Sequence, residues 1–385
     1  ENSFFIFDGA VKEIKCEVHD YVYDNINSPY RKTSCGGHNS NFNELWFFFP
    51  VGTDQLTPNK YVIWNYIENV WSIGSMDRGC WLDQGVFDFP TAENAMTGIA
   101  IGASISGKKP IIVHQRVEFS LLSVEQIINQ AAKWFFMNGG TKSVPLVIRL
   151  IIGRGWGQGP QHSQSLDAIF AHIPGLKVIS LSTPYNAKGL LISSIEDKNP
   201  VIVFEHRWLH EIQGVVPKKY YKIPLGKAKV VNKGTDITLV SSSYMVIECL
   251  RSAKILKNYS IKVEVVDIQS LRPLDIHTII NSVKKTKKAI IIDNGGINFG
   301  ISSEIMAKLY ENISKKEKSI YHIERIGPPD NPIPSTRELA KYCYPNYIDI
   351  IKKTEKILKK KFKNLEKYKD NIPLDQPNKD FMGPF

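Results

Sequence analysis

Residues 91–104, TAENAMTGIAIGAS, and residues 110–114, PIIVH, show a pattern that much of the chain repeats. In the first segment, apolar side chains recur at the three- to four-residue spacing of a helix with one buried face. They are Met96, Ile99, Ala100 and Ala103. The second segment is a short apolar run rich in β-branched residues, which is typical of a strand buried on both faces. The sequence therefore predicts a helix at about 93–106 that precedes a buried strand.

The same alternation of strands and helices continues to about residue 352. Residues 123–126, SVEQ, have the composition of a capping box, and the helix that they start should end at the glycines 139–140. Further strands are predicted at 144–152, 177–182, 201–205, 236–242, 262–268 and 288–293, and further helices at 246–257, 275–285 and 348–369. Such alternation favours parallel sheets with helical connections. We therefore predict two α/β domains, 89–221 and 222–352, and a lysine-rich helix end with an extended tail, 353–385.

Residues 1–88 differ in composition from everything that follows. Four of the seven tryptophans lie there: Trp46, Trp64, Trp71 and Trp81. Aromatic or β-branched runs at 45–49, 61–64 and 70–73 are separated by Pro, Gly and Asn residues, which favour turns. No helical period appears. The segment is predicted to be short, β-rich and antiparallel, of the blade or meander type.

Composition limits the classes of function. The net charge of +11 comes mostly from lysines at 284–288 and 352–369, two runs without arginine and with few aromatic residues. A solvated helix face explains these runs better than nucleic-acid binding does. No apolar run approaches the ~18 residues of a membrane span, and the first residues resemble no secretory signal. We therefore expect a cytoplasmic protein without membrane or nucleic-acid partners. The five cysteines are widely spaced, so neither a zinc site nor a disulfide framework is predicted.

Three side chains stand out as candidates for chemistry, although each also has an ordinary structural explanation. Glu93 lies in the first turn of its predicted helix, where the helix dipole alone favours a carboxylate. Phe119 follows a strand and could belong to the core, and His162 follows a glycine-rich loop and could be a surface residue. That loop, 153–159, lacks the Gly-Lys-Ser/Thr ending of a phosphate-binding loop.

The order and spacing of these motifs change the interpretation. From about Phe89 to the C-terminus, the sequence resembles the beta subunit of the first component of 2-oxo-acid dehydrogenases, pyruvate and branched-chain types, in the transketolase-like superfamily. The resemblance rests on residues 91–103, on Phe119-Ser120, on Gln161-His162-Ser163-Gln164 and on three later runs: 174–178, 197–200 and 271–275. It implies two parallel-sheet domains, pyrimidine-binding and C-terminal, and an oxidoreductase that decarboxylates a 2-oxo acid, with pyruvate the first guess.

The resemblance also assigns roles. Glu93 would hydrogen-bond the aminopyrimidine ring of thiamine diphosphate, Phe119 would stack on that ring, and His162 would face the substrate or the incoming lipoyl group. Gln115, with Arg116 beside it, resembles a branch of the family distinct from typical pyruvate enzymes and is a further candidate for cofactor contact. A monovalent-cation (K⁺) site is implied as well, with ligands supplied mainly by backbone carbonyls. Its residues would be Leu146, Ser194, Ile195, Asp197 and Asn199.

The diphosphate half of the cofactor site is missing from the sequence. The superfamily binds diphosphate and Mg²⁺ through a Gly-Asp-Gly motif followed by an Asn pair, and no such motif occurs; 293–296, DNGG, is the nearest imitation. The resemblance therefore implies an alpha subunit that holds the diphosphate and Mg²⁺, an α2β2 assembly, and a lipoyl-bearing acyltransferase as the next partner.

The resemblance does not extend to residues 1–88. The runs 37–46 and 71–80 resemble a structural protein of a tailed-phage virion, and the helix and strand that open the family's sheet are missing. The sequence therefore predicts a chimera, either a genuine fusion or an assembly artefact, joined near 86–90. The alternative function is a virion structural or adsorption protein with an inactive enzyme-like part. Loss of the first strand should leave a sheet edge and apolar surface uncovered and impair the protein.

Overall fold

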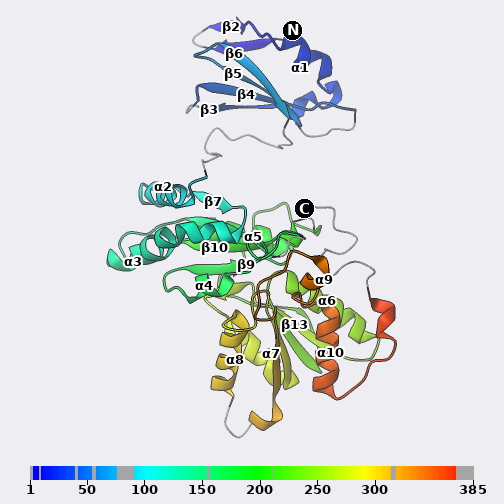
Figure 1. Ribbon diagram of the computed structural model, residues 1–385. Helices are drawn as coiled ribbons and strands as arrows, with labels where there is room; N and C mark the ends of the chain where they lie inside the picture. Colours follow the sequence, from blue (N-terminus) through cyan, green and yellow to red (C-terminus); the bar gives the residue numbers. More distant parts are fainter. Residues whose placement is uncertain are drawn as a thin grey trace. The chain divides into compact units, whose positions relative to one another are not determined.

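The structure is a computed structural model that describes residues 3–7, 10–39, 42–53, 58–75, 91–153, 157–210, 212–313 and 318–369. It divides the chain into two compact units, Glu1–Pro90 and Thr91–Phe385 (Figure 1). Each unit has its own hydrophobic core.

The first unit is a small antiparallel β structure. Strands β3 (Cys35–Asn39), β4 (Glu44–Phe49), β5 (Lys60–Asn65) and β6 (Val70–Ser75) pair in chain order, which is the predicted meander. A hairpin of β1 (Phe4–Phe7) and β2 (Val11–Ile14) forms a second sheet. The predicted absence of helices was wrong, because α1 (His19–Asn25) and the 3₁₀ helix η1 (Ser28–Thr33) lie between the sheets in the chain. Only Val22 of α1 is buried, so its apolar period is too short to detect in the sequence.

The second unit begins with a five-stranded sheet in the order β14-β9-β10-β8-β7. The inner strands are parallel, whereas β14, which comes from the C-terminal part of the chain, is antiparallel to β9. The strands are β7 (Ile111–His114), β8 (Val147–Ile152), β9 (Lys177–Ser180), β10 (Val201–His206) and β14 (Ser270–Arg272). The helices are α2 (Glu93–Ile105), η2 (Val117–Ser123), η3 (Gln126–Ala131), α3 (Ala132–Met137), α4 (Asp167–His172), α5 (Pro184–Glu196) and η4 (Arg207–Leu209).

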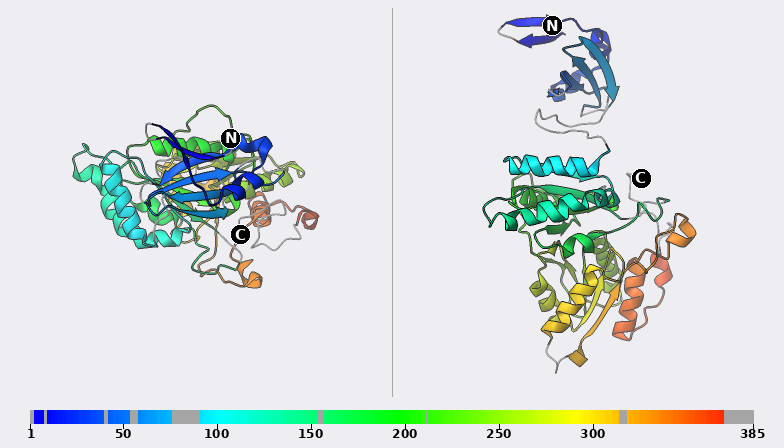
Figure 2. Two further views of the ribbon diagram at one scale, coloured as in Figure 1. Left: turned by 90° about the horizontal axis from the view of Figure 1, so that it is seen from above. Right: turned by 60° about the vertical axis from the view of Figure 1, so that its left-hand side comes forward.

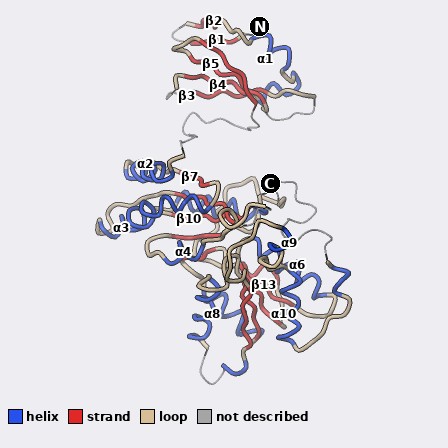
Figure 3. The backbone as a smooth tube through the Cα atoms, viewed as in Figure 1, coloured by secondary structure: helices blue, strands red, loops and turns tan. Residues whose placement is uncertain are grey.

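A second sheet, in the order β11-β13-β12-β15-β16, follows in the same unit. Its strands are β11 (Lys229–Asn232), β12 (Ile237–Ser241), β13 (Val263–Asp267), β15 (Lys288–Ile292) and β16 (His322–Ile326). Its helices are α6 (Tyr244–Lys257), α7 (Ile276–Thr286), α8 (Ile301–Asn312), η5 (Lys318–Ile320), α9 (Arg337–Ala340), α10 (Tyr347–Leu358) and η6 (Leu365–Tyr368). All strands but β11 run parallel, so the predicted α/β class is confirmed. Figure 3 shows the red strands of this sheet between blue helices.

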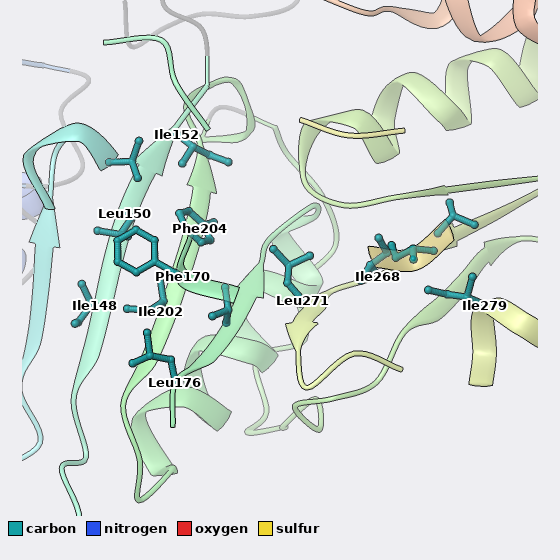
Figure 4. Close-up of a cluster of buried hydrophobic side chains, with 14 of the residues drawn as sticks. Ile148, Leu150, Ile152, Phe170, Leu176, Ile202, Phe204, Ile268, Leu271 and Ile279 are labelled. Carbon is teal, nitrogen blue, oxygen red and sulfur yellow. The ribbon is translucent and has the colours of Figure 1, made fainter. Parts of the chain in front are cut away.

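The core explains why the two sheets form one unit. Alternate residues of the second sheet face opposite ways: Val240 packs in the core of α7 and α8, and Leu239 in the core of α6 and α10. The α7 side of this core continues into the first sheet, where Ile148, Leu150 and Phe204 are fully buried (Figure 4). Figure 2 shows α2, in cyan, on the far side of the green first sheet from the yellow helices.

The predicted terminal helix at 348–369 is shorter than expected. The helix α10 ends at Leu358, and Lys359 adopts a left-handed conformation with φ of 52°. Its buried residues include Ile350, Ile351 and Ile357, whereas the lysines after it lack an apolar period. The charge pattern alone suggested one continuous helix, and the apolar pattern decides where it stops. In the described part of the chain, no helix is long and apolar enough to cross a membrane.

The expected uncovered edge lies at β7. Among the described residues β7 pairs only with β8, and its Ile111 and Val113 are 43% and 40% exposed. Leu122 in η2 and Ile99 in α2 are more exposed still. In the isolated chain, apolar surface of this extent marks an interface or an aggregation site.

Ser243 provides a stability prediction. It stands between β12 and α6 with φ of 53° and ψ of −139°, and its buried hydroxyl oxygen has no hydrogen-bond partner. Glycine adopts this conformation without strain, whereas strained non-glycine residues cost about 1–3 kcal/mol. Ser243→Gly should therefore raise the melting temperature by roughly 2–4 °C, a net gain of about 1 kcal/mol. Ser243→Ala is the control; if it raises the melting temperature equally, the hydroxyl and not the backbone is responsible.

Candidate active site

The predicted catalytic residues come from three separate segments near the carboxyl ends of β7 and β8. Glu93 is the first residue of α2, Phe119 lies in η2 directly after β7, and His162 lies between β8 and α4. The helix α2 packs against η2. The carboxyl ends of parallel strands are where open α/β sheets commonly place their ligands.

Phe119 and His162 are in contact. Their ring centroids are 5.5 Å apart at an interplanar angle of 53°. Phe119 keeps 37% of its surface exposed, so the ring has a free face for another flat group. His162 Nδ1 is buried and has no hydrogen-bond partner. An unpaired ring nitrogen beside an open aromatic face is suited to bind a polar ligand, because a buried polar atom without a partner is unfavourable.

Glu118 links the two segments that carry this pair. Its Oε1 accepts a 2.8 Å hydrogen bond from the backbone N–H of Gln164. The bond joins η2 to the segment that contains His162, and it therefore helps to fix the separation of the two rings. The sequence analysis did not identify Glu118, although its position next to Phe119 was a usable signal.

Glu93 is half-buried and lies near a buried histidine. Its backbone carbonyl accepts a 2.8 Å hydrogen bond from the hydroxyl of Thr97, which closes the first turn of α2. Burial lowers the pKa of His114, and the Glu93 carboxylate partly opposes that change. His114 therefore favours the neutral form, and neither of its ring nitrogens has a hydrogen-bond partner. His114 was missed as a site residue because it ends an apolar strand and reads as core.

Buried polar atoms without partners gather at this edge of the sheet. In the described residues they include atoms of His114, Arg116, Glu118, Gln158, His162, Ser163 and Arg207. Native interiors contain few such atoms, and each calls for an explanation. A polar ligand bound here would supply partners for them, so the residues fit a group with several hydrogen-bonding atoms. Gln115 is exposed on the outer side of the same turn.

The predicted cation ligands surround the C-terminus of α5 but already have protein partners. The carbonyl of Leu146 accepts a 2.9 Å bond from Val201 N–H, and that of Ser194 accepts a 3.3 Å bond from Asp197 N–H. Asp197 also pairs with Lys177 and accepts a 2.9 Å bond from Asn199 N–H. Ile195 is half-buried. A carbonyl oxygen has a second lone pair, so a K⁺ site here stays a prediction. Among the described residues, no group of three or more His, Cys, Asp or Glu could hold a metal.

A second feature lies where the two sheets of this unit meet. A cavity of about 520 Å³ is lined by the loop at Gln164, by His206 and by Asp293. Asp293 and Asp167 are both buried, and an ideal Cβ on Gly295 would lie 3.8 Å and 3.3 Å from their respective Oδ1 atoms. Burial, and then the charge of Asp293, raise the pKa of Asp167 to about 7; burial also raises the pKa of Asp293.

This carboxylate pair predicts how stability depends on pH. The native state holds a proton on Asp167 up to about pH 7, whereas the unfolded chain releases it near 3.8. The native state therefore binds more protons between these values, and stability should fall as pH rises from 4 to 7, by about 1 kcal/mol per unit. Urea unfolding at pH 5 and 7 checks this. Asp167→Asn should be less pH-dependent than wild type over this window; equal slopes would contradict the assignment.

Comparisons with known proteins place this site in a family. The description "Transketolase, pyrimidine binding domain" matches residues 34–211, and "Transketolase, C-terminal domain" matches residues 226–350. A beta subunit of acetoin:2,6-dichlorophenolindophenol oxidoreductase from Cupriavidus necator is 38% identical over 274 residues, which are 71% of this chain and 80% of that protein. The mitochondrial pyruvate dehydrogenase E1 component subunit beta of Bos taurus is 37% identical over 290 residues, 74% of this chain and 80% of its own length. The chain belongs to the 2-oxo-acid dehydrogenase E1 beta-subunit family.

Further comparisons agree with this E1 beta assignment. The pyruvate dehydrogenase E1 component subunit beta of Porphyra purpurea is 46% identical over 231 residues, 60% of this chain and 70% of that one. A solved structure, "Split gene transketolase, inactive beta4 tetramer", has a TM-score of 0.58 at 20% identity, over 70% of this chain and 83% of its own, and supports the fold alone. The prediction of an oxidoreductase subunit with a transketolase-like fold is confirmed.

The alternative function, a virion structural protein, has no support from these relatives. The pyrimidine-binding match itself begins at residue 34, inside the segment that suggested it. The family is linked to thiamine diphosphate and its members are subunits of multi-subunit enzymes, so an alpha partner is implied.

Proposed function

We propose that this E1 beta subunit acts with an alpha subunit to decarboxylate a 2-oxo acid on thiamine diphosphate and to pass the acyl group to a lipoyl-bearing acyltransferase. The observation that carries the proposal is the Phe119–His162 pair, with its open aromatic face and unpaired Nδ1, beside the helix that begins with Glu93. Pyruvate is the first substrate to test, because two of the relatives are named for it.

The residues fit one half of the cofactor. Glu93 would hold a ring nitrogen of the aminopyrimidine, Phe119 would cover its face, and Gln115 would reach it from the exposed side of the turn. When bound, the thiazolium ring of the cofactor acts as an electron sink for decarboxylation. The sequence contains no Gly-Asp-Gly motif. We therefore assign diphosphate and Mg²⁺ binding to the alpha subunit, in an α2β2 assembly.

His162 provides the proton chemistry on the substrate side. Its unpaired Nδ1 can donate or accept a proton, and contact with Phe119 restrains the ring. A histidine that titrates near neutral pH is suited to transfer a proton to or from a substrate oxygen. The Glu118–Gln164 bond holds the segment in place while this occurs.

The test is to produce the chain with an alpha subunit encoded beside it and to titrate the complex with thiamine diphosphate. Saturable binding together with release of CO₂ from pyruvate or a branched-chain 2-oxo acid is expected. The alpha subunit alone is the control, and it should release no CO₂. A stable complex that binds no cofactor would overturn the proposal. Full activity would also overturn the expectation that the uncovered β7 edge impairs the protein.

A further inference from the structure

Two arginines flank the end of β8 at the same edge of the sheet. Arg116 follows β7 and is extended, with φ of −142° and ψ of 141°, and Arg207 follows β10 directly. Both strands pair with β8 in parallel, one on each side. Because neighbouring strands lie about 4.8 Å apart, the two backbones are roughly 10 Å apart. Arginine side chains are long enough to converge across that distance.

Neither guanidinium is satisfied within the protein. Arg116 is only 7% exposed, and the Nη1 atoms of Arg116 and Arg207 are both buried without a hydrogen-bond partner among the described residues. Burial, and then the nearby charge of Arg207, lower the pKa of Arg116 to about 10. An unpaired buried donor costs about 1–3 kcal/mol, and more when it is charged. Two such donors side by side indicate a missing anion.

Glu118 is the acidic group that faces Arg116, and it does not balance both charges. Its Oε1 already accepts the Gln164 bond. If its unpaired Oε2 turned to Arg116, Arg207 would still lack a partner, so two positive charges share one negative charge. The arrangement therefore has room for an additional anionic group close to the Phe119–His162 pair.

The reaction limits which anionic group this can be. In decarboxylation the carboxylate of the 2-oxo acid loses its charge as CO₂ leaves. A strong ion pair to that carboxylate would stabilise the ground state more than the transition state and slow the reaction. A buried arginine pair is better suited to a group that stays charged throughout. We propose that Arg116 and Arg207 bind the second carboxylate of a dicarboxylic 2-oxo acid, an inference that rests on the proposed function.

The experiment compares 2-oxoglutarate with pyruvate in the complex of this chain with its alpha subunit. Wild type should have the higher kcat/KM for 2-oxoglutarate. In Arg207→Gln and in Arg116→Gln, the ratio of the two kcat/KM values should fall at least tenfold, as expected for losing a charged hydrogen bond. The fall should come from a raised KM for 2-oxoglutarate with kcat retained, because the contact is the same in ground and transition states. Arg207→Lys keeps the charge and should restore part of the ratio.

Each other outcome is decisive. Equal losses for both substrates would show that the arginines only support the loop, and the inference would be wrong. A wild-type complex that decarboxylates pyruvate without preferring 2-oxoglutarate would overturn the inference and leave the proposed function intact. A complex that neither binds thiamine diphosphate nor decarboxylates either acid would overturn both.

Discussion

Glu93→Gln should lower the rate of 2-oxo-acid decarboxylation by the complex at least a hundredfold. Glutamine has nearly the same shape and can still make a hydrogen bond from the first turn of α2, but it cannot share a proton with a ring nitrogen. Positioned acid–base groups contribute about 10²–10⁴-fold to rate. The loss should appear in kcat, while thiamine diphosphate binding weakens by less, because Phe119 and the alpha subunit still hold the cofactor. Rates with saturating cofactor and a binding titration check both statements.

Glu125→Gln is the matched control for this substitution. Glu125 is an exposed carboxylate whose Oε1 accepts a 2.9 Å bond from Gln130 and touches none of the candidate site residues. It should keep full activity. If Glu93→Gln also kept its rate while the complex bound the cofactor, the carboxylate would be a helix-capping group and the assignment would be wrong.

Gly175→Ala should have the largest effect on folding. Gly175 precedes β9 with φ of +99°, and an ideal Cβ there would lie 1.9 Å from the carbonyl oxygen of Ala132 at the start of α3. That oxygen belongs to helix backbone and cannot move aside. The left-handed strain and the overlap together should cost about 3 kcal/mol or more. In a unit of this size the melting temperature should then fall by roughly 6–12 °C.

Gly107→Ala separates the two causes. Gly107 has a similar φ, +90°, but an ideal Cβ there meets nothing within 4 Å. It should cost only the conformational strain, about 1 kcal/mol. If both variants lost the same stability in a thermal melt, the contact between Gly175 and α3 would contribute nothing.

The sequence predicted the α/β class and most central strands because their apolar runs are long and uninterrupted, as in β8 and β10. It also located Glu93, Phe119 and His162, since the order of their motifs is specific. It could not show which atoms lack partners. The unpaired atoms of His114 and Arg207 emerge only when strands far apart in the chain are brought side by side. Nor could it show that the meander is preceded by α1, a helix with a single buried residue.

The strand β14 ties the two halves of the E1 beta unit together. It lies after β13 in the chain yet completes the outer edge of the first sheet beside β9. A cut in the segment between η4 and β11 would therefore not release two self-sufficient domains. The amino-terminal fragment would keep a sheet with one edge open, and it could close that edge only through complementation by the carboxy-terminal fragment.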